Sequence, residues 1–474
     1  MPFNSIIFLV FAALFFALWP LAKRTDNGRW VTITAASLVF YGWWDWRFIF
    51  LLLGAGLNDY ATARAMAAWP SWKRWFLVAS LAGNLGSLSV FKYAGFIAEN
   101  VGLLAAAAGH PVDLMSKLPA FTLILPIGIS FFTFQSMSYT IDVYRGHMKP
   151  VTNLFHFFAF LSMFPQLVAG PIVRARDLIP QLAVRRDTTE ESRWEGMKLV
   201  AGGYFKKVVI ADNLAPFVNT AFAAVPAPES SLYWWLAVGA FAFQILFDFG
   251  GYSDIARGLA KWMGFDFLVN FNHPYTSTSL REFWSRWHIS LSTWFRDYVY
   301  IPLGGSKKGE ARGHVNMWLT MVVSGLWHGA AFHFLAWGAV HALFLSAERI
   351  TGWPEKLKKL PGGSVLALAA VLFQVLIAWV FFRAQDMAQA FAIIGTMLEF
   401  NSRTGFPTTE AFKVGVLYLS VGLAMELFHF SRLDARKWFS PTVYRSVEVA
   451  TVAVLITFSV FLRGPGMQFI YFQF

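Results

Sequence analysis

Long apolar stretches recur along the chain and are separated by short polar segments. A helix that crosses the bilayer core needs roughly 20 apolar residues. On that basis the pattern predicts spans at 3–21, 31–44, 47–62, 75–93, 121–141, 198–222, 232–250, 315–330, 332–348, 364–383, 411–430 and 446–462. Several of these are short, and 153–170 is typical of a re-entrant or surface segment, so we expect about 11 true spans. The apolar runs are continuous and do not alternate, which indicates helices and argues against a β-barrel.

Lys and Arg residues are unevenly shared among the segments that join these spans. They gather at 23–30, 64–74, 145–149, 172–198, 257–312, 356–359 and 432–437, whereas 95–120 contains only Lys117. Cytoplasmic loops retain more Lys and Arg than external loops do. We therefore expect these basic segments in the cytoplasm, and 95–120 and both chain ends in the periplasm.

Composition strengthens the prediction of a membrane protein. Of the 474 residues, 57% are hydrophobic and 14% are charged, whereas an average soluble domain is about 25% charged. The net charge of +12 fits basic cytoplasmic loops against the lipid bilayer, so we expect no nucleic-acid partner. The absence of Cys excludes disulfides and acyl-cysteine intermediates. No linker or internal repeat divides the pattern, and we expect one membrane domain over residues 1–474.

One basic stretch is also rich in aromatic residues. The segment SLREFWSRWHISLSTWFRDYVYIPLGG predicts an amphipathic helix over Leu280–Tyr300 at the cytoplasmic membrane surface. Its bulky aromatics would anchor it among the lipid headgroups, namely Trp284, Trp287, Trp294 and Phe295. Its basic residues Arg281, Arg286 and Arg296 would face water or the phosphates of a bound ligand.

Among the ten His residues, His328 has the most unusual setting. It lies in MVVSGLWHGAAFHFLAWGAVHALFL, within a stretch from Val315 to Ala347 that has no Asp, Glu, Lys or Arg. An ionisable group in such a segment is costly unless it faces a cavity or a partner. This favours a functional His328 over a neutral imidazole bonded to a backbone carbonyl. His333 and His341 do not follow at ligand spacing, so the pattern predicts no metal site.

Three further residues have two interpretations each. His288, beside Arg286 and Trp287, is compatible with an interfacial ring or with a site residue. Asp248 and Asp254 could orient an imidazole or a hydroxyl, or they could mark a helix end.

Neither a phosphate-binding loop nor a G-x-S-x-G nucleophile motif is present in the sequence. With these motifs excluded, the sequence favours a mechanism in which a buried His acts as general base between two bound substrates.

These motifs resemble the membrane-bound O-acyltransferase (MBOAT) superfamily. The strings that carry the resemblance are LPIGISFFTFQSMSYTIDVYRG, LVAGPIVRARDL, FDFGGYSDIARGLA, NFNHPY with the Trp-rich segment above, SGLWHGA and the terminal FIYFQF. They are most similar to the membrane component of bacterial alginate O-acetyltransferases. The resemblance implies an all-α polytopic protein, with a ring of transmembrane helices and re-entrant and interfacial helices around a central tunnel. It also implies that His328 is the essential residue and that His288 is a second active-site residue.

The resemblance further implies a function. An acetyl group would arrive from a cytoplasmic donor, acetyl-CoA or another acyl thioester, with no cofactor bound permanently. It would cross the bacterial inner membrane to periplasmic acetyltransferase partners that modify an exopolysaccharide such as alginate. Two alternatives are D-alanyl transfer to teichoic acid and peptidoglycan O-acetylation. A third, an acyl-group transporter without chemistry of its own, would place charged pairs deep in several spans and would tolerate loss of His328.

Overall fold

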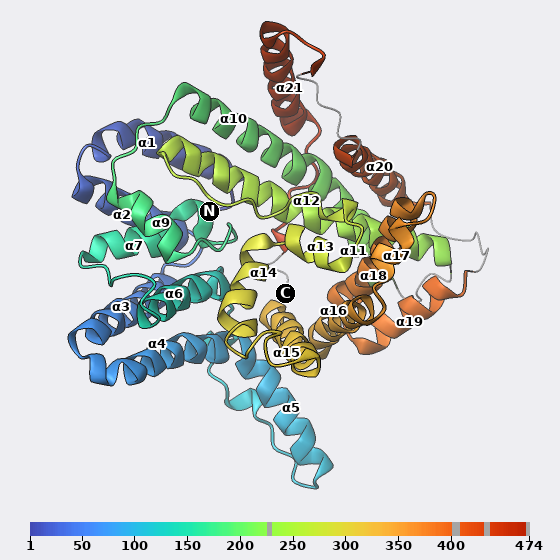
Figure 1. Cartoon of the computed structure of the whole chain (residues 1–474), viewed down its shortest axis with the longest axis horizontal. Coiled ribbons are helices and arrows are strands. Elements are labelled where there is room, and N and C mark those ends of the chain that lie inside the picture. Colours follow the sequence, from blue (N-terminus) through green and yellow to red (C-terminus); the bar gives the residue numbers. More distant parts are fainter. Residues whose placement is uncertain (225–229, 401–407, 431–436, 471–474) are drawn as a thin grey trace. The chain divides into compact units, whose positions relative to one another are not determined.

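The computed structural model describes residues 1–224, 230–400, 408–430 and 437–470. Within these ranges the chain forms helices and no strand (Figure 1), which confirms the all-α prediction. The chain divides into two compact units, Met1–Gly196 with Ala256–Leu268 and Met197–Ile255 with Val269–Phe474. The single membrane domain over residues 1–474 stays a prediction. Arg432 and Arg436, which contributed to the expected topology, lie outside the described residues.

The first unit is built from helices of the N-terminal half. Its elements are α1 (Ile6–Ala22), α2 (Asp26–Gly42), α3 (Arg47–Ala68), η1 (Pro70–Trp72), α4 (Lys73–Leu88), η2 (Ser89–Tyr93), α5 (Ala94–Ala107), η3 (Met115–Lys117), η4 (Ala120–Leu123), α6 (Ile129–Tyr144), α7 (Leu154–Ser162), α8 (Phe164–Leu167) and α9 (Ala175–Ala183). The predicted 153–170 segment is thus two short helices, and its side chains are buried almost throughout, which disagrees with a surface segment.

A buried carboxylate joins three helices of this unit. Asp59 on α3 is fully buried and accepts hydrogen bonds from Ser80 and Asn84 on α4 at 2.6 and 2.7 Å. It also accepts one from Ser136 on α6. Since a buried carboxylate is costly without donors, this network fixes how α3, α4 and α6 pack together.

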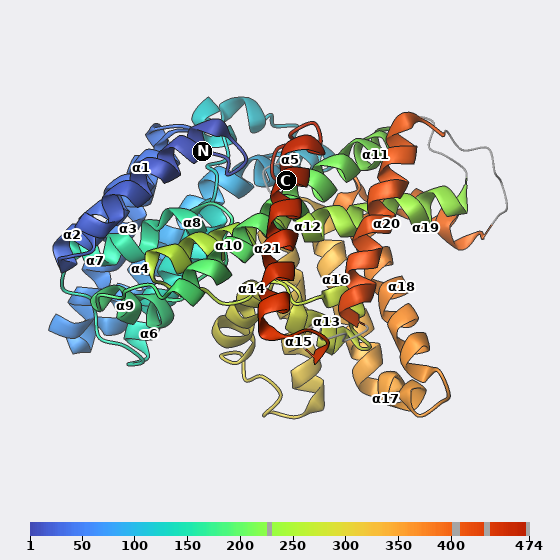
Figure 2. The ribbon, with the colours of Figure 1, turned by 90° about the horizontal axis from the view of Figure 1, so that it is seen from above.

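The second unit contains the Trp-rich and His-rich segments. It begins within α10 (Glu190–Tyr204) and includes most of α12 (Ser231–Met263). The other elements are η5 (Phe205–Ala211), α11 (Asp212–Ala223), η6 (Pro274–Thr276), α13 (Leu280–Arg286), α14 (Ile289–Phe295), η7 (Arg296–Tyr300), α15 (Glu310–His328), α16 (Phe332–Thr351), α17 (Trp353–Lys358), α18 (Gly363–Arg383), α19 (Met387–Leu398), α20 (Glu410–Phe430) and α21 (Pro441–Phe461). Figure 2 shows α16 beside α18, and the core between them is rich in tryptophan.

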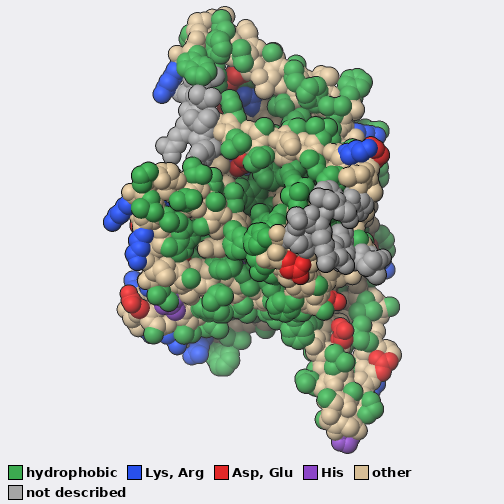
Figure 3. All heavy atoms as spheres, turned by 90° about the vertical axis from the view of Figure 1, so that its right-hand side faces the viewer, with side chains coloured by type: hydrophobic (Ala, Val, Ile, Leu, Met, Phe, Trp, Pro, Cys, Tyr) green, Lys and Arg blue, Asp and Glu red, His purple; other side chains and the backbone are tan. Residues whose placement is uncertain are grey.

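Five helical segments of the described chain are long and apolar enough to cross a membrane. They are Pro70–Ala107, Ser231–Met263, Gly363–Arg383, Glu410–Phe428 and Pro441–Phe461. Hydrophobic side chains are spread over the whole face shown in Figure 3, and charged side chains are few on it. These features indicate a multi-pass membrane protein, while the number of about 11 spans stays a prediction.

Two predicted elements are wrong in detail. The span at 121–141 is interrupted, because Pro126 and Gly128 separate η4 from α6 and Gly128 adopts a φ of +77°. The amphipathic helix over Leu280–Tyr300 is three pieces, α13, α14 and the π-helical turn η7. The break falls at His288, whose φ is +40°, a left-handed conformation that an L-residue helix cannot continue through.

Candidate active site

His328 lies at the junction of two closely packed helices. α15 ends at His328, Gly329 is extended, and α16 begins three residues later. The two helices lie side by side (Figure 1). A Cβ at Gly325 would lie 2.2 Å from the Phe334 carbonyl oxygen, and one at Gly338 would lie 2.3 Å from that of Met321. Only glycine permits such an approach of two helix backbones, and this approach holds His328 at the helix end.

The His328 imidazole is enclosed by aromatic rings. The residue is 5% exposed, and its ring packs edge-on against Trp327, Trp337 and Phe382 at centroid distances of 4.9, 5.0 and 5.2 Å. The neighbouring His333 pairs with the backbone carbonyl of Phe381 at 2.9 Å. The functional role of His328 stays a prediction.

His288 is held in one tautomer by Asn270. The Ser290 backbone N–H donates to one terminal atom of the Asn270 amide at 3.2 Å, so this atom is the oxygen, Oδ1. The same oxygen lies 3.2 Å from His288 Nδ1. An amide oxygen only accepts, so His288 Nδ1 carries the proton and donates it. Nε2 is then the nitrogen with the lone pair, which is what a general base requires.

The surroundings of His288 also fix its charge. The side chain is 1% exposed, and Phe249 packs edge-on against its ring at 4.6 Å. Burial lowers the pKa of His288 to about 3, because the imidazolium is poorly solvated there. The ring is therefore neutral at physiological pH.

Trp327 brings the two predicted histidines together. Its indole contacts the His288 ring at 6.2 Å and the His328 ring at 4.9 Å. The two imidazoles, 40 residues apart in sequence, thus lie on one tryptophan. The structure confirms that His328 is buried, shows that His288 is buried as well, and places both around a common aromatic centre.

His341 extends this aromatic centre, and it was not among the residues predicted for the site. It is fully buried on α16 and contacts Trp284 and Trp337 at 5.0 Å each. Neither ring nitrogen has a hydrogen-bond partner within the described part of the chain. Trp337 in turn contacts His328. The signal in the sequence was the spacing of four between Trp337 and His341, which puts both on one face of a helix.

The aromatic residues predicted as membrane-surface anchors lie inside the protein. Trp287, Trp294 and Phe295 are 1, 5 and 4% exposed, and Trp287 packs against Trp379 at 5.0 Å. The anchoring prediction is wrong for these three, because the turn at His288 directs the segment into the core. Trp284 is half-buried and contacts Trp337.

The three predicted arginines differ in what they contact. Arg286 donates to Glu282 at 2.6 Å and to Thr276 at 3.0 Å. Arg296 pairs with Asp297 at 2.6 Å. Arg281 is exposed, while its backbone N–H and that of Leu280 donate to Glu348 and so fix the start of α13.

Each of the two predicted aspartates of α12 pairs with a lysine, and neither marks a helix end. Asp248 pairs with Lys207 at 2.7 Å and accepts the Ile470 backbone N–H at 2.7 Å. Asp254 pairs with Lys206 at 2.7 Å. The helix-end interpretation is wrong here, because α12 continues to Met263. The orienting role stays a prediction, and the two lysines provide the counter-charges.

Comparison with known proteins adds to this geometry. Residues 6–384 match the sequence model of the family described as "MBOAT, membrane-bound O-acyltransferase family". A Pseudomonas putida protein named "Probable alginate O-acetylase AlgI" is 39% identical over 407 residues, 85% of this chain and 81% of the relative. A Helicobacter pylori peptidoglycan O-acetyltransferase is 32% identical over 434 residues, 84% of this chain and 80% of the relative. A Bacillus subtilis teichoic acid D-alanyltransferase is 28% identical over 264 residues, 54% of this chain and 67% of the relative.

Proposed function

The chain belongs to the membrane-bound O-acyltransferase family, and on that premise we propose that it transfers acetyl groups for O-acetylation of an alginate-like exopolysaccharide, with His328 as general base. It is an O-acyltransferase by its family. The observation that carries the site assignment is the convergence of His288 and His328 on Trp327.

His328 performs the proton transfers in this proposal. Its imidazole takes the proton of the acceptor hydroxyl while the hydroxyl oxygen attacks the carbonyl carbon of an acetyl thioester. The carbon–sulfur bond then breaks, and His328 returns the proton to the sulfur. No net proton is consumed, and general base catalysis of this kind contributes about 10²–10⁴-fold in rate.

His288 complements this step as a neutral acceptor. Asn270 holds the proton on Nδ1, so Nε2 can accept a hydrogen bond from a substrate hydroxyl or from a thiol. The aromatic wall formed by Phe249, Phe271 and Trp327 excludes water, which strengthens such hydrogen bonds and protects the thioester from hydrolysis.

The donor is an acetyl thioester, with acetyl-CoA as our proposal, and it arrives from the cytoplasm. Among the three basic residues of this region, Arg281 has an exposed side chain and follows the fixed start of α13. It is the arginine best placed to meet donor phosphates. Arg286 and Arg296 already pair with carboxylates and would shape the basic surface around it.

The acceptor class follows the relatives. Identity to this chain falls from 39% for the Pseudomonas putida alginate protein to 32% for the peptidoglycan enzyme and 28% for the D-alanyltransferase. This order supports an alginate-like polymer over the two other acceptors. In a bacterial cell the protein would reside in the inner membrane and deliver acetyl groups to periplasmic acetyltransferase partners.

The test is acetylation of secreted polymer in an alginate-producing host that lacks its own membrane O-acetylase. Wild-type chain should restore ester-linked acetate. His328→Ala should insert normally, because it removes a polar group from an apolar segment, and polymer acetate should fall about 10²–10⁴-fold or disappear.

The matched control is His314→Ala. His314 lies on the same helix, about four turns away, and bonds Ser346 at 3.2 Å. This variant should acetylate like the wild type. Near-normal acetate with His328→Ala, at equal membrane levels, would refute the catalytic assignment. Restored D-alanyl esters in place of acetate would refute the proposed acyl group.

A further inference from the structure

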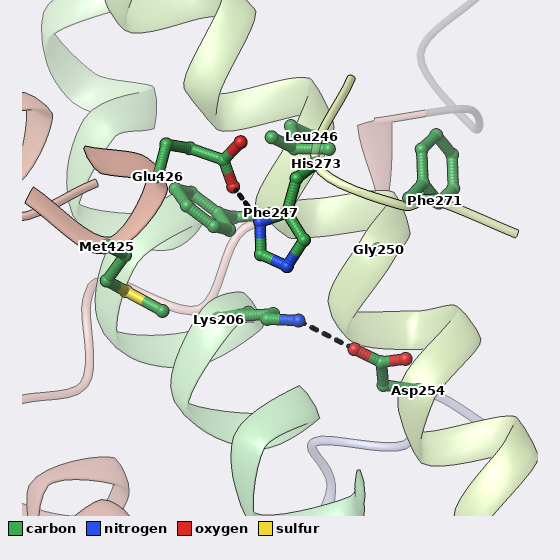
Figure 4. A pocket seen from close by; sticks show the side chains of 9 residues that line it. All are labelled: Lys206, Leu246, Phe247, Gly250, Asp254, Phe271, His273, Met425 and Glu426. Atoms are coloured by element: carbon green, nitrogen blue, oxygen red, sulfur yellow. Dashed lines mark hydrogen bonds and ion pairs between the residues drawn. The ribbon is translucent and has the colours of Figure 1, made fainter. Parts of the chain in front are cut away.

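The second unit contains a pocket that neither of the two active-site histidines lines. It is bounded by η5, the middle of α12, the loop before η6, and α20 (Figure 4). Its volume is about 70 Å³. Since one water molecule needs about 10–15 Å³, the pocket has room for about five waters or for a group of several heavy atoms.

An ion pair and a histidine–carboxylate pair face each other across this pocket. Lys206 Nζ lies 2.7 Å from Asp254 Oδ2, and His273 Nδ1 lies 2.8 Å from Glu426 Oε1. Figure 4 shows the second nitrogen of His273 directed towards the Lys206 ammonium. Phe247 and Met425 form an apolar wall beside these groups. The pocket therefore presents a cation, two carboxylates and hydrocarbon together.

Glu426 has an unused hydrogen-bonding position. The residue is 6% exposed, and its Oε2 accepts no hydrogen bond from the residues that the structure describes. An unsatisfied buried acceptor is destabilising, and more so when it is charged. His273, which binds the other oxygen, is itself held at a φ of +47°, a conformation that is uncommon for a residue with a side chain. Such strain is found where a site positions a group.

The pocket lies where a lipid headgroup would be. α12 and α20 are both apolar enough to span the membrane, and charges in such helices face cavities or partners. Lys206 lies eight residues after the basic segment 172–198, and Asp254 lies three residues before the basic segment 257–312. Glu426 lies six residues before the basic segment 432–437. By the distribution of Lys and Arg, the pocket is therefore at the level of the cytoplasmic headgroups.

We propose that this pocket binds the headgroup of an aminophospholipid, phosphatidylethanolamine, from the cytoplasmic leaflet. The phosphate accepts from Lys206, and the primary ammonium donates to Glu426 Oε2 and to Asp254. The apolar wall receives the first methylenes of the acyl chains. Phosphatidylcholine has no N–H to donate to Glu426. Phosphatidylglycerol can donate only from neutral hydroxyl groups, which form weaker hydrogen bonds to a carboxylate than an ammonium does.

The pocket also adjoins the candidate active site. Phe271 lines the pocket and contacts the His288 ring at 5.9 Å, and Asn270, which orients His288, precedes it in the same loop. A bound lipid would therefore hold the loop that positions His288. Lipid binding itself is independent of the proposed acetyl transfer and can be measured without turnover.

The experiment compares three lipids with identical acyl chains. The delipidated full-length protein in detergent is titrated with phosphatidylethanolamine, phosphatidylcholine or phosphatidylglycerol, and bound lipid is counted by native mass spectrometry. We expect phosphatidylethanolamine to bind about tenfold or more tightly than the other two, the usual effect of one hydrogen bond to a buried charge. Glu426→Gln should abolish this preference.

The matched control is Glu410→Gln, on the same helix but exposed and paired with Lys413; it should keep the preference. If Glu426→Gln does not fold, Asp254→Asn provides the second test, with the same expected loss, because the ammonium also donates to Asp254. Equal binding of the three lipids would overturn the proposal. Displacement of phosphatidylethanolamine by acetyl-CoA, lost in Glu426→Gln, would also overturn it and would assign the pocket to the acyl donor.

Discussion

At the scale of single residues, Asn270 sets the protonation of His288. Asn270→Asp would place a carboxylate 3.2 Å from Nδ1, and a neighbouring negative charge favours the imidazolium. The pKa of His288 should then rise from about 3 towards neutrality. An imidazolium cannot accept a proton, so activity should be lost as pH falls through the raised pKa. The acid limb of the pH–rate profile should move to higher pH, measured as acetyl transfer in membrane vesicles.

Two other variants separate this electrostatic effect from a structural one. Asn270→Ala removes the hydrogen bond and adds no charge, so the rate should fall at every pH with no shift of the acid limb. Ser290→Ala removes one donor to Asn270 and should leave the midpoint of the acid limb unchanged. An unshifted acid limb in Asn270→Asp would show that His288 does not take part in catalysis.

These residues also show how much of the candidate site could be predicted from the sequence. His328 could be predicted, because it lies in a stretch of 33 residues without Asp, Glu, Lys or Arg. Burying an ionisable group in such an apolar segment is costly unless the group has a function. The role of Asn270 could not, because it depends on a turn that brings position 270 against position 288. His341 was passed over because a helical wheel shows its face but not what that face contacts.

At the scale of elements, the contact between α15 and α16 depends on glycine. In Gly325→Ala the new methyl would lie 2.2 Å from the Phe334 carbonyl oxygen, so the helices must separate. Overpacking of this kind costs about 1–3 kcal/mol. We expect a lower Tm in detergent and a reduced acetylation rate, since His328 is the last residue of α15.

The control for this prediction is Gly395→Ala on α19, where an added Cβ meets no atom within 4 Å. Alanine also favours the helix over glycine by about 1 kcal/mol. The Tm of the Gly395→Ala variant should therefore stay the same or rise. Equal losses in both variants would mean that glycine contributes flexibility at Gly325 and not close packing.

A buried ion cluster joins the next group of elements. Lys207 on η5 lies 2.9 Å from Asp212 on α11 and 2.7 Å from Asp248 on α12. It also donates to the Met467 carbonyl at 3.2 Å, which ties down the chain after α21. Lys207→Ala leaves two buried carboxylates without a cation, and we expect a loss of about 3–5 kcal/mol in unfolding free energy.

Neutralising the whole cluster should recover part of this loss. Lys207→Met combined with Asp212→Asn and Asp248→Asn removes the uncompensated charges while keeping the side-chain volumes. Lys413→Ala, which breaks an exposed pair, should cost no more than about 1 kcal/mol. The measurement is thermal unfolding in one detergent. A Lys207→Ala variant as stable as Lys413→Ala would contradict the structural role of the cluster.

Element boundaries were harder to predict than element identity. The Trp-rich segment has the composition of an interfacial helix, but the strongest determinant of its path is one left-handed residue, His288. Composition cannot reveal that conformation. Its tryptophans are buried because the turn directs them against Trp379. An aromatic, basic segment is thus ambiguous between a membrane surface and an aromatic core until its turns are known.

At the scale of the whole molecule, the arrangement in the membrane follows from charge and is testable by labelling. Basic residues predict 64–74 in the cytoplasm and 95–120 in the periplasm. The chain has no Cys, so single-cysteine variants report one position each. Lys117→Cys and Arg74→Cys are suitable because both side chains are exposed. In intact cells a membrane-impermeant maleimide should label position 117 and not position 74, and permeabilised cells should label both. Labelling of position 117 only after permeabilisation would invert the topology, and with it the cytoplasmic position of the donor surface around Arg281 and of the lipid pocket at Glu426.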